Sequence, residues 1–424
     1  MISRNDILFI ILFGILTISY SQSPKIAAKN NLYSRVDSII TNGIINEAFP
    51  GAQLLVAEKG VIIFHKTYGF HTYDSLQPVK KNDLYDLASL TKILGPLPLL
   101  MKLYEEGSID LDAPFSIYWK SWQGSKDKKD LTLREILAHQ AGLTPYIVFL
   151  KKVLHNDKLR FRFLRHSPSK KFKKQAFQNL YVADRFQKIM NREIRHSKVD
   201  DLKTYKYSGL AFLIFPELIE QLSGHSFSYN LTKEFIFPLE IPSLGYLPRQ
   251  KNFPNAIVPT EYDDQYRKAL VQGWVHDENA SLLGGISGNA GLFGTAHDLF
   301  RYMQFYQNYG ILDGQRLLEE ETVKEFTRVQ FPENENRRGL GFDKPLLDNA
   351  SKPLEDAYPA PSASPESFGH SGFTGTFVWA DPKNQLVFIF LSNRVFPIRE
   401  HRQLYDLKIR TRLHQLFYDQ LDKS

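Results

Sequence analysis

A serine and a lysine three residues apart, Ser89 and Lys92, stand at the start of an apolar run that extends from Ile93 to Leu103. The surrounding residues predict a turn that delivers Ser89 onto the first turn of a buried helix, where residues three apart are neighbours. A serine hydroxyl is a weak nucleophile until a base removes its proton. A neutral lysine can be that base, and burial disfavours the charged ammonium. The pair therefore predicts a serine nucleophile with its own base, placed where helix-start N–H groups can face a developing oxyanion.

Ser-x-x-Lys is a common pattern, so its context decides its meaning. The chain contains two further matches, Ser125 to Lys128 and Ser167 to Lys170, and both lie in lysine-rich polar stretches without an apolar helix behind them. The chemistry requires a buried helix to hold the base beside the hydroxyl. We therefore expect only Ser89 to be a nucleophile.

The bulk composition excludes several kinds of site. The 424 residues are enough for one large domain or two closely packed lobes. The absence of cysteine excludes disulfides, thiol catalysis and cysteine-based metal sites. The twelve histidines show no ligand-like spacing. We predict no metal and no cofactor.

The N-terminus has the pattern of a secretory signal. Arg4 precedes the apolar run from Ile7 to Ile18, and small polar residues follow up to Gln22. An apolar core of about twelve residues is short for a membrane span, which needs about 20. We predict a signal peptide over residues 1–22 and a periplasmic or secreted mature protein. An uncleaved N-terminal membrane anchor is the alternative.

The net charge of +7 is concentrated in one segment. Between Lys151 and Lys203 there are sixteen Lys or Arg residues and five Asp or Glu residues. Aromatic residues such as Phe161, Phe172 and Phe186 are interleaved with these charges, which favours an ordered helix or lid over a disordered tail. This basic segment could be a solvated surface or could bind an anionic envelope polymer. We predict no nucleic-acid partner for an exported protein.

The apolar periodicity predicts elements at both ends of the chain that position the Ser89 helix. Helices are expected over 31–48, 131–143, 210–222 and 296–309, and a further helix closes the chain. Strands are expected over 53–57 and 61–65, joined as a hairpin, and over 376–380 and 386–392. This order indicates an α/β fold of the α+β type, with an antiparallel sheet built from both chain ends and an all-helical insertion lobe. We assign the α/β lobe to 31–88 and 365–421, and the helical lobe to about 89–310, with a basic insertion over 146–204.

Prolines interrupt the Ser89 helix soon after Lys92. Pro96 and Pro98 cannot donate to the carbonyls four residues before them, so the pattern predicts a kink just past Lys92. A glycine-rich stretch over 284–294 predicts tight backbone turns near a site, but it lacks the Gly-Lys-Ser/Thr of a phosphate loop.

Three motifs in this order resemble the serine β-lactamase and penicillin-binding-protein superfamily, most closely its class C β-lactamase and carboxylesterase branch. They are Ser89 to Lys92, Tyr207-Ser208-Gly209 and His370-Ser371-Gly372. The resemblance covers most of Asn31 to Leu421, and residues 146–204 have no clear counterpart.

The resemblance implies a mechanism and a site. Ser89 would be the acylated nucleophile, Lys92 its base or the tuner of that base, and Tyr207 a proton shuttle to the leaving group. The backbone N–H groups of Ser89 and Phe373 would form the oxyanion hole. The wall against which the substrate lies would be a strand formed by His370, Ser371 and Gly372.

Two positions depart from the family pattern. Gly209 stands where β-lactamases and peptidases carry an asparagine that contacts the lysine and the substrate amide. His370 replaces the lysine that attracts a substrate carboxylate, and an ordinary histidine is mostly uncharged at pH 7. Both changes favour an esterase-like or otherwise divergent serine hydrolase.

Several of these residues also have simpler interpretations. Tyr207 could be a core aromatic residue and His370 a structural residue of a strand. His276, Asp277 and Glu278 could form an acid/base cluster, although a hydrogen-bonded group that stabilises a loop is the favoured interpretation. His139 is predicted to be a packing residue at the end of a helix.

Three hypotheses follow. The first is an exported serine hydrolase that acts on an ester or a cell-wall-related amide, with a small molecule or cell-wall fragment as substrate. The second is a DD-peptidase or β-lactamase proper. The third is a catalytically silent module that binds an envelope polymer, and the intact Ser89, Lys92 and Tyr207 count against it.

Overall fold

The computed structural model describes residues 24–156, 158–200 and 202–421. The signal peptide predicted for residues 1–22 lies outside these residues. Within the described part of the chain, no helix combines the length and the apolarity needed to cross a bilayer.

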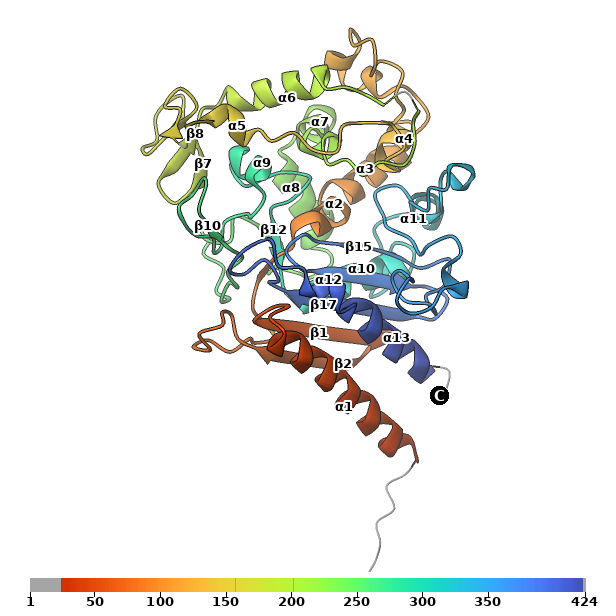
Figure 1. Cartoon of the computed structure of the whole chain (residues 1–424). Coiled ribbons are helices and arrows are strands. Elements are labelled where there is room, and N and C mark those ends of the chain that lie inside the picture. The colour runs from red at the N-terminus through yellow and green to blue at the C-terminus, as the bar shows by residue number, and fades with distance from the viewer. Residues whose placement is uncertain (1–23, 157, 201, 422–424) are drawn as a thin grey trace, which may run out of the picture.

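A five-stranded antiparallel sheet contains both ends of the chain, as predicted (Figure 1). Its order is β15-β16-β17-β1-β2, so the C-terminal strand β17 pairs directly with the N-terminal strand β1. The strands are β1 (Gly51–Glu58), β2 (Val61–Gly69), β15 (Phe368–Ser371), β16 (Phe377–Asp381) and β17 (Leu386–Ser392).

Alternation along the central strands divides the core between the two faces of the sheet. On β1, Leu54 and Val56 face one hydrophobic cluster, whereas Leu55 and Ala57 face the other. The first cluster packs under helices α1 (Pro24–Ile45) and α13 (Ile409–Leu421), which lie against each other, and α12 (Gln403–Asp406) leads into α13. The second cluster includes α10 (Ala296–Gln307), which packs on β1, β16 and β17. Both faces of the sheet are therefore covered, and the central strands are buried, whereas the edge strand β2 is largely exposed or half-buried.

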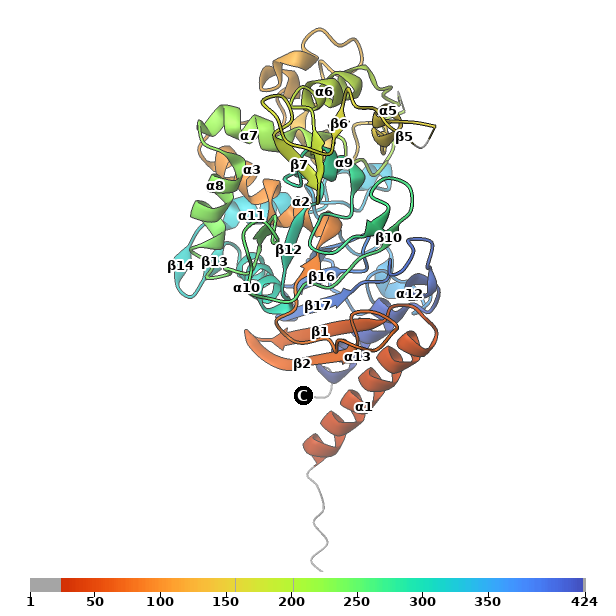
Figure 2. The same ribbon diagram turned by 90° about the vertical axis from the view of Figure 1, so that its left-hand side faces the viewer.

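The second lobe stands above α10 and carries the segment with Ser89 (Figures 1 and 2). Its principal helices are α2 (Thr91–Leu94), α3 (Pro96–Glu105), α4 (Leu133–Leu137), α5 (Leu150–Val153), α6 (Phe186–His196), α7 (Phe215–Ser223), α8 (Phe227–Leu231), α9 (Glu278–Leu282) and α11 (Glu320–Thr327). Its core is continuous with one face of the sheet, because Leu97, Phe212 and Val378 belong to the same cluster. The lobe boundaries proposed from the sequence stay predictions.

The helical lobe also contains short strands, so the prediction that it is all helical was wrong in this detail. Two small sheets lie in the basic insertion and others in the loops that follow it. They comprise β4 (Leu154–His155), β5 (Lys158–Leu159), β6 (Leu164–Arg165), β7 (Lys174–Phe177), β8 (Leu180–Val182), β9 (Gly245–Tyr246), β10 (Tyr262–Asp263), β11 (Ala269–Leu270), β12 (Leu292–Gly294), β13 (Ile311–Leu312) and β14 (Gln315–Arg316), and β12 pairs with β3 (Tyr85–Asp86) and β9. Strands of two to four residues are too short for an alternating pattern to be recognised in the sequence.

The basic segment is ordered, as predicted, but only part of it is helical. Strands β6, β8 and β7 pair with one another, and α6 follows them. Both views place these elements at the end of the molecule farthest from β1 and β2 (Figures 1 and 2). The hydroxyl of Ser281, on α9, donates to the carbonyl of Ala176 on β7 (2.8 Å) and ties the segment to the body of the lobe.

The helix after Ser89 is broken rather than kinked. Helix α2 ends at Leu94, Gly95 is not helical, and α3 begins at Pro96. Proline fits the first position of a helix, where its missing N–H costs nothing. The carbonyl of Ile93, which the break leaves without a helical donor, accepts a hydrogen bond from the buried Tyr306 hydroxyl (2.7 Å).

Candidate active site

A buried carboxylate shapes the turn that carries Ser89. Asp86 ends the short strand β3 (Tyr85–Asp86) and accepts hydrogen bonds from the N–H groups of Ala88 (2.8 Å) and His276 (2.6 Å). Ala88 has a φ of 46°, which an L-residue rarely adopts. A 3₁₀ turn over Ala88–Leu90 then leads into α2. This conformation places Ser89 directly before α2, close to the start of the helix that the sequence predicts, and leaves it partly exposed.

Lys92 lies directly beside the Ser89 hydroxyl. Its Nζ is 2.8 Å from Ser89 Oγ and donates to the backbone carbonyl of Asn289 (3.1 Å). The lysine is only 2% exposed, and the rings of Tyr207 and Phe212 lie within 6 Å of the amine. Among the described residues no carboxylate forms an ion pair with Lys92. The amine is therefore held by neutral groups and directed at the hydroxyl.

Tyr207 completes a cluster of three groups with Ser89 and Lys92. The centre of its ring lies 5.3 Å from Lys92 Nζ. Burial by itself raises the pKa of the Tyr207 phenol, but Lys92, Ser89 and Arg338 outweigh burial and leave that pKa below its ordinary value. A phenol of lowered pKa beside an amine can accept and return a proton, which is the role that the family resemblance implies.

The loop around Tyr207 is held by His139. The N–H of Ser208 donates to His139 Nδ1 (3.3 Å), and the N–H of Lys206 donates to the carbonyl of His139 (2.9 Å). The two rings of His139 and Tyr207 lie 4.5 Å apart. Burial, and then the charges of Arg338 and Lys92, lower the pKa of His139 far below its ordinary value, so the ring is neutral and its Nδ1 can accept. His139 therefore does more than pack a helix end, because it positions Tyr207.

The predicted substrate wall lies at the edge of the main sheet. Gly372 follows β15, and a Cβ there would lie 2.0 Å from Thr376 Oγ1 and 2.7 Å from the carbonyl of Leu87. Only glycine fits this approach of β15 to the Ser89 turn. The hydroxyl of Thr376 donates to that same Leu87 carbonyl (3.2 Å), and Thr374 donates to the carbonyl of Asp86 (2.8 Å). The wall and the nucleophile turn are thus connected by hydrogen bonds.

Phe373 projects beside this wall. It is 48% exposed, and its carbonyl accepts a hydrogen bond from Arg394 Nε (2.9 Å), whose guanidinium lies over the phenyl ring. Ser371 is partly exposed at the end of β15. The contribution of the Ser89 and Phe373 N–H groups to an oxyanion hole stays a prediction.

His370 is buried and uncharged. Burial, with the charges of Arg338 and Lys92, lowers its pKa to about 3. Its Nδ1–H donates to the carbonyl of Ser371 (2.8 Å), and Nε2 accepts from Arg338 Nη2 (3.3 Å). The position that carries a lysine in many relatives of the resembled branch therefore presents no charge of its own.

Arg338 supplies the positive charge behind His370, and the sequence analysis did not identify it. Its guanidinium lies 5.5 Å from the Tyr207 ring centre and forms an ion pair with Asp343 (2.8 Å). Arg337 also pairs with Asp343 (2.6 Å), so two cations share one carboxylate. Arg338 lies in an irregular loop without periodicity. Only its arginine-arginine-glycine context could have pointed to it.

The glycine-rich stretch does approach the site, as predicted. Asn289 offers its carbonyl to Lys92, while its side-chain oxygen accepts from Ser287 Oγ (2.7 Å) and its amide donates to Asp277 (3.1 Å). The side chain of Asp277 also caps α9 by accepting from the N–H of Ala280 (2.8 Å). Asp277 therefore holds the loop that carries the Asn289 carbonyl.

The other acidic and imidazole groups of this region hold the loop as well. The ring of His276 lies 3.2 Å from Glu261, and Glu278 pairs with Arg399 (2.7 Å). These contacts agree with the favoured interpretation of His276, Asp277 and Glu278 as a hydrogen-bonded group. Lys128 of the second Ser-x-x-Lys match is buried and donates to the carbonyl of Ser197, which is a structural contact.

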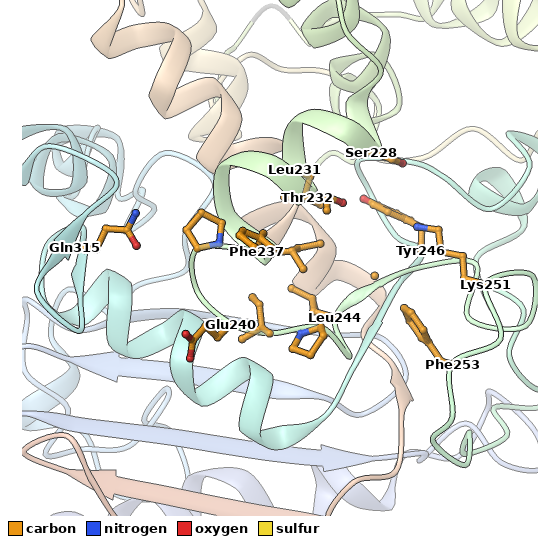
Figure 3. A pocket seen from close by; sticks show the side chains of 15 residues that line it. Ser228, Leu231, Thr232, Phe237, Glu240, Leu244, Tyr246, Lys251, Phe253 and Gln315 are labelled. Atoms are coloured by element: carbon orange, nitrogen blue, oxygen red, sulfur yellow. The ribbon is translucent and has the colours of Figure 1, made fainter.

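A separate hollow of about 800 Å³ lies away from Ser89, beside α8 and β9 (Gly245–Tyr246) (Figure 3). Its lining is mostly apolar and includes Leu231, Phe237, Leu244 and Phe253. None of the predicted site residues lines it. It touches the site only indirectly, because Tyr246 donates its hydroxyl to the carbonyl of Ser287 (2.8 Å).

Fold and site together define the class of protein: a member of the serine β-lactamase and transpeptidase superfamily, with a Ser-x-x-Lys pair between a helical lobe and an antiparallel sheet. The Beta-lactamase family model matches residues 36–412, which is most of the chain. The chain therefore belongs to the Beta-lactamase family and is a serine hydrolase of that general kind.

Relatives and solved structures of similar fold extend over nearly the whole chain. A protein from Salmonella gallinarum described as a "Putative D-alanyl-D-alanine carboxypeptidase" is 28% identical over 411 residues, covering 91% of this chain and 88% of its own. The class C β-lactamase from Rhodobacter sphaeroides is similar with a TM-score of 0.62 and 16% identity, covering 91% of this chain and 99% of its own. EstCE1, a hydrolase with promiscuous acyltransferase activity, is similar with a TM-score of 0.62 and 17% identity, and the match covers 91% of this chain and 98% of EstCE1.

Proposed function

We propose that this protein is an exported serine hydrolase that forms an acyl-enzyme on Ser89 and hydrolyses an ester or a cell-wall-related amide. The observation that carries this proposal is the contact of 2.8 Å between Lys92 Nζ and Ser89 Oγ, with the centre of the Tyr207 ring 5.3 Å from the same amine. A nucleophile, a base and a second proton carrier within mutual reach are what acyl transfer requires.

The proposed reaction has two halves. In the first, Ser89 Oγ attacks the substrate carbonyl carbon and its proton passes to Lys92. Tyr207 then protonates the leaving alcohol or amine as the carbonyl bond to it breaks. In the second half, the Tyr207 phenolate takes a proton from water, and the water oxygen attacks the carbonyl carbon of the acyl-enzyme. Lys92 then returns its proton to Ser89 Oγ as the ester bond to Ser89 breaks and the acid leaves. Lys92 and Tyr207 end the cycle in their starting protonation states.

Two features favour an ester among the possible substrates. Gly209 offers no side chain to hold a substrate amide. His370, whose pKa is lowered to about 3, offers no charge to a substrate carboxylate at neutral pH. An ester needs neither contact, and its alcohol leaves more readily than an amine.

A DD-carboxypeptidase is the second candidate, and Arg338 is the observation that favours it. Arg337 and Arg338 share the single carboxylate of Asp343, which leaves positive charge directly behind His370. Such charge could attract the terminal carboxylate of a peptide through the neutral imidazole. The name of the Salmonella gallinarum relative agrees with this candidate.

Mass spectrometry of the intact protein tests the proposal. The wild type and Ser89→Ala would each be incubated with a fluorophosphonate, an activated ester and a penicillin. We expect the first two reagents to add their acyl or phosphonyl mass to the wild type and not to Ser89→Ala. Rapid, stoichiometric addition of penicillin would favour the carboxypeptidase. No adduct with any reagent would contradict the acyl-enzyme and favour a silent binding module.

A further inference from the structure

A second hollow, of about 610 Å³, lies on the helical lobe between α6, α7 and the segment 118–121. Four of its lining residues are cationic: Lys120, Lys188, Arg192 and Arg195. We call this hollow the basic pocket. It contains none of the residues assigned to hydrolysis.

The sequence of α6 explains why cations line this pocket. Phe186, Met190 and Ile194 recur every four residues and are buried in the core of the lobe. Lys188, Asn191, Arg192 and Arg195 follow a three- and four-residue spacing on another face of the same helix. Packing of the apolar face therefore presents the cationic face to the hollow.

The charge of the pocket is not balanced by the protein. In the described part of the chain, none of its four cations forms an ion pair with a carboxylate. Glu217 is the single carboxylate of the lining, and its Oε2 already accepts hydrogen bonds from the amides of Gln187 (2.8 Å) and Asn191 (2.8 Å). Like charges gathered in a concave site focus a positive potential and attract anions.

The remaining lining is suited to a sugar. The half-buried Tyr118 supplies aromatic surface, and Ser121, Asn191 and Gln221 supply hydroxyl and amide groups. The guanidinium group of arginine binds a carboxylate or phosphate through two parallel hydrogen bonds. A volume of about 610 Å³ lies within the range of pockets that hold small ligands or a few sugar rings.

We propose that the basic pocket binds an anionic saccharide, a sugar chain that carries carboxylate or phosphate groups. The anions would pair with Lys188, Arg192 and Arg195, and a sugar ring would pack on Tyr118. The sequence predicted that an anionic envelope polymer could bind somewhere along the segment 151–203, and the present proposal places the binding site in this one hollow. It is independent of the substrate that Ser89 attacks.

Calorimetric titration with a galacturonate hexamer tests the proposal. Maltohexaose is the uncharged probe and a single-stranded DNA hexamer is the anion without sugar carboxylates. The test variant is Lys188→Ala/Arg192→Ala, whose side chains are exposed on α6. The matched control is Lys170→Ala/Lys171→Ala, which removes the same charge from exposed positions of the same basic segment outside the pocket.

We expect the galacturonate hexamer to bind the wild type. Its affinity for the pocket variant should be at least about tenfold lower, and its affinity for the control should stay within about twofold of that for the wild type. Raising the salt concentration should weaken binding further. Melting curves of both variants check that they fold. Arg192→Lys keeps the positive charge but removes the guanidinium group, so its affinity for the hexamer should lie between those of the wild type and the double variant.

Three outcomes would overturn the proposal. Equal weakening in the pocket variant and the control would mean diffuse attraction to the basic segment. Tighter binding of the DNA hexamer, with the same dependence on Lys188 and Arg192, would make the pocket a nucleic-acid site. Absence of galacturonate binding to the wild type at low salt would leave no saccharide site.

Discussion

At the scale of single residues, the site differs from the family pattern at position 209, where a side-chain amide is missing. Gly209 replaces an asparagine, and a Cβ added at Gly209 would meet no atom within 4 Å. The backbone there does not require glycine, since its φ is not in the left-handed region. The missing amide is therefore a chemical difference that one substitution can restore without a clash.

We predict that Gly209→Asn increases the rate of acylation by penicillin at least about tenfold, because the amide can hydrogen bond to Lys92 and to the substrate amide. A tenfold gain corresponds to about 1.4 kcal/mol, which one such bond can supply. Stopped-flow acylation measures it. Gly209→Ala is the control that adds a Cβ without an amide, and equal rates for the two variants would refute the prediction.

His370 gives a prediction about pH. With a pKa of about 3 its imidazole stays neutral across pH 5 to 8, whereas an ordinary histidine would gain charge as the pH falls through 6.5. We therefore expect kcat/KM for a neutral ester to show the same pH dependence from 5 to 8 in wild type and His370→Gln. An inflection near pH 6.5 that disappears in the variant would show that His370 titrates there.

At the scale of elements, the site depends on how the turn at Ser89 is joined to β15. The buried Asp86 accepts two backbone N–H groups, and Ala88 occupies a strained conformation between Asp86 and the nucleophile. Such a strained backbone conformation persists only where contacts with the surrounding residues hold it in place. Asp86 is therefore a positioning residue for Ser89, although it touches no substrate.

We predict that Asp86→Ala lowers the free energy of unfolding by about 2–3 kcal/mol, because two buried N–H groups lose their acceptor. It should also lower kcat more than it raises KM, since Ser89 would no longer be held in place. Urea unfolding and steady-state kinetics measure these effects. Asp74→Ala, in an exposed turn, is the matched control and should change stability by less than about 0.5 kcal/mol.

At the scale of the whole molecule, the two ends of the chain meet in one sheet, and the helices that cover this sheet bury titratable groups. His414 on α13 is 1% exposed and stacks on Phe388 with 4.5 Å between ring centres. Burial lowers its pKa from 6.5 to about 3. Because the unfolded chain binds this proton more readily, His414 destabilises the fold as the pH falls from 6.5 toward 3.

We predict that His414→Phe reduces the dependence of stability on pH. Between pH 6 and pH 4 the wild type should lose about 1.4 kcal/mol more per pH unit than the variant, the value for one proton. Chemical denaturation at several pH values measures this slope. An unchanged slope in His414→Phe would contradict the assignment.

The sequence by itself determined the sheet built from both chain ends, the helix that follows Ser89, and the pairing of Ser89 with Lys92. These depend on short-range spacing: alternation along a strand, and a separation of three residues on a helix. Gly209 and His370 were likewise recognised by their places within motifs.

Only the tertiary structure decided the roles of Arg338, His139, Asp86 and the Asn289 carbonyl. Each acts on a residue distant in sequence, and a backbone carbonyl or a loop arginine leaves no periodic pattern. The tertiary structure also decided the short strands of the insertion, and the basic pocket between α6, α7 and the segment 118–121. The physical reason is that charge, burial and hydrogen bonding at a site are properties of neighbours in space, and those neighbours are brought together only when the core packs.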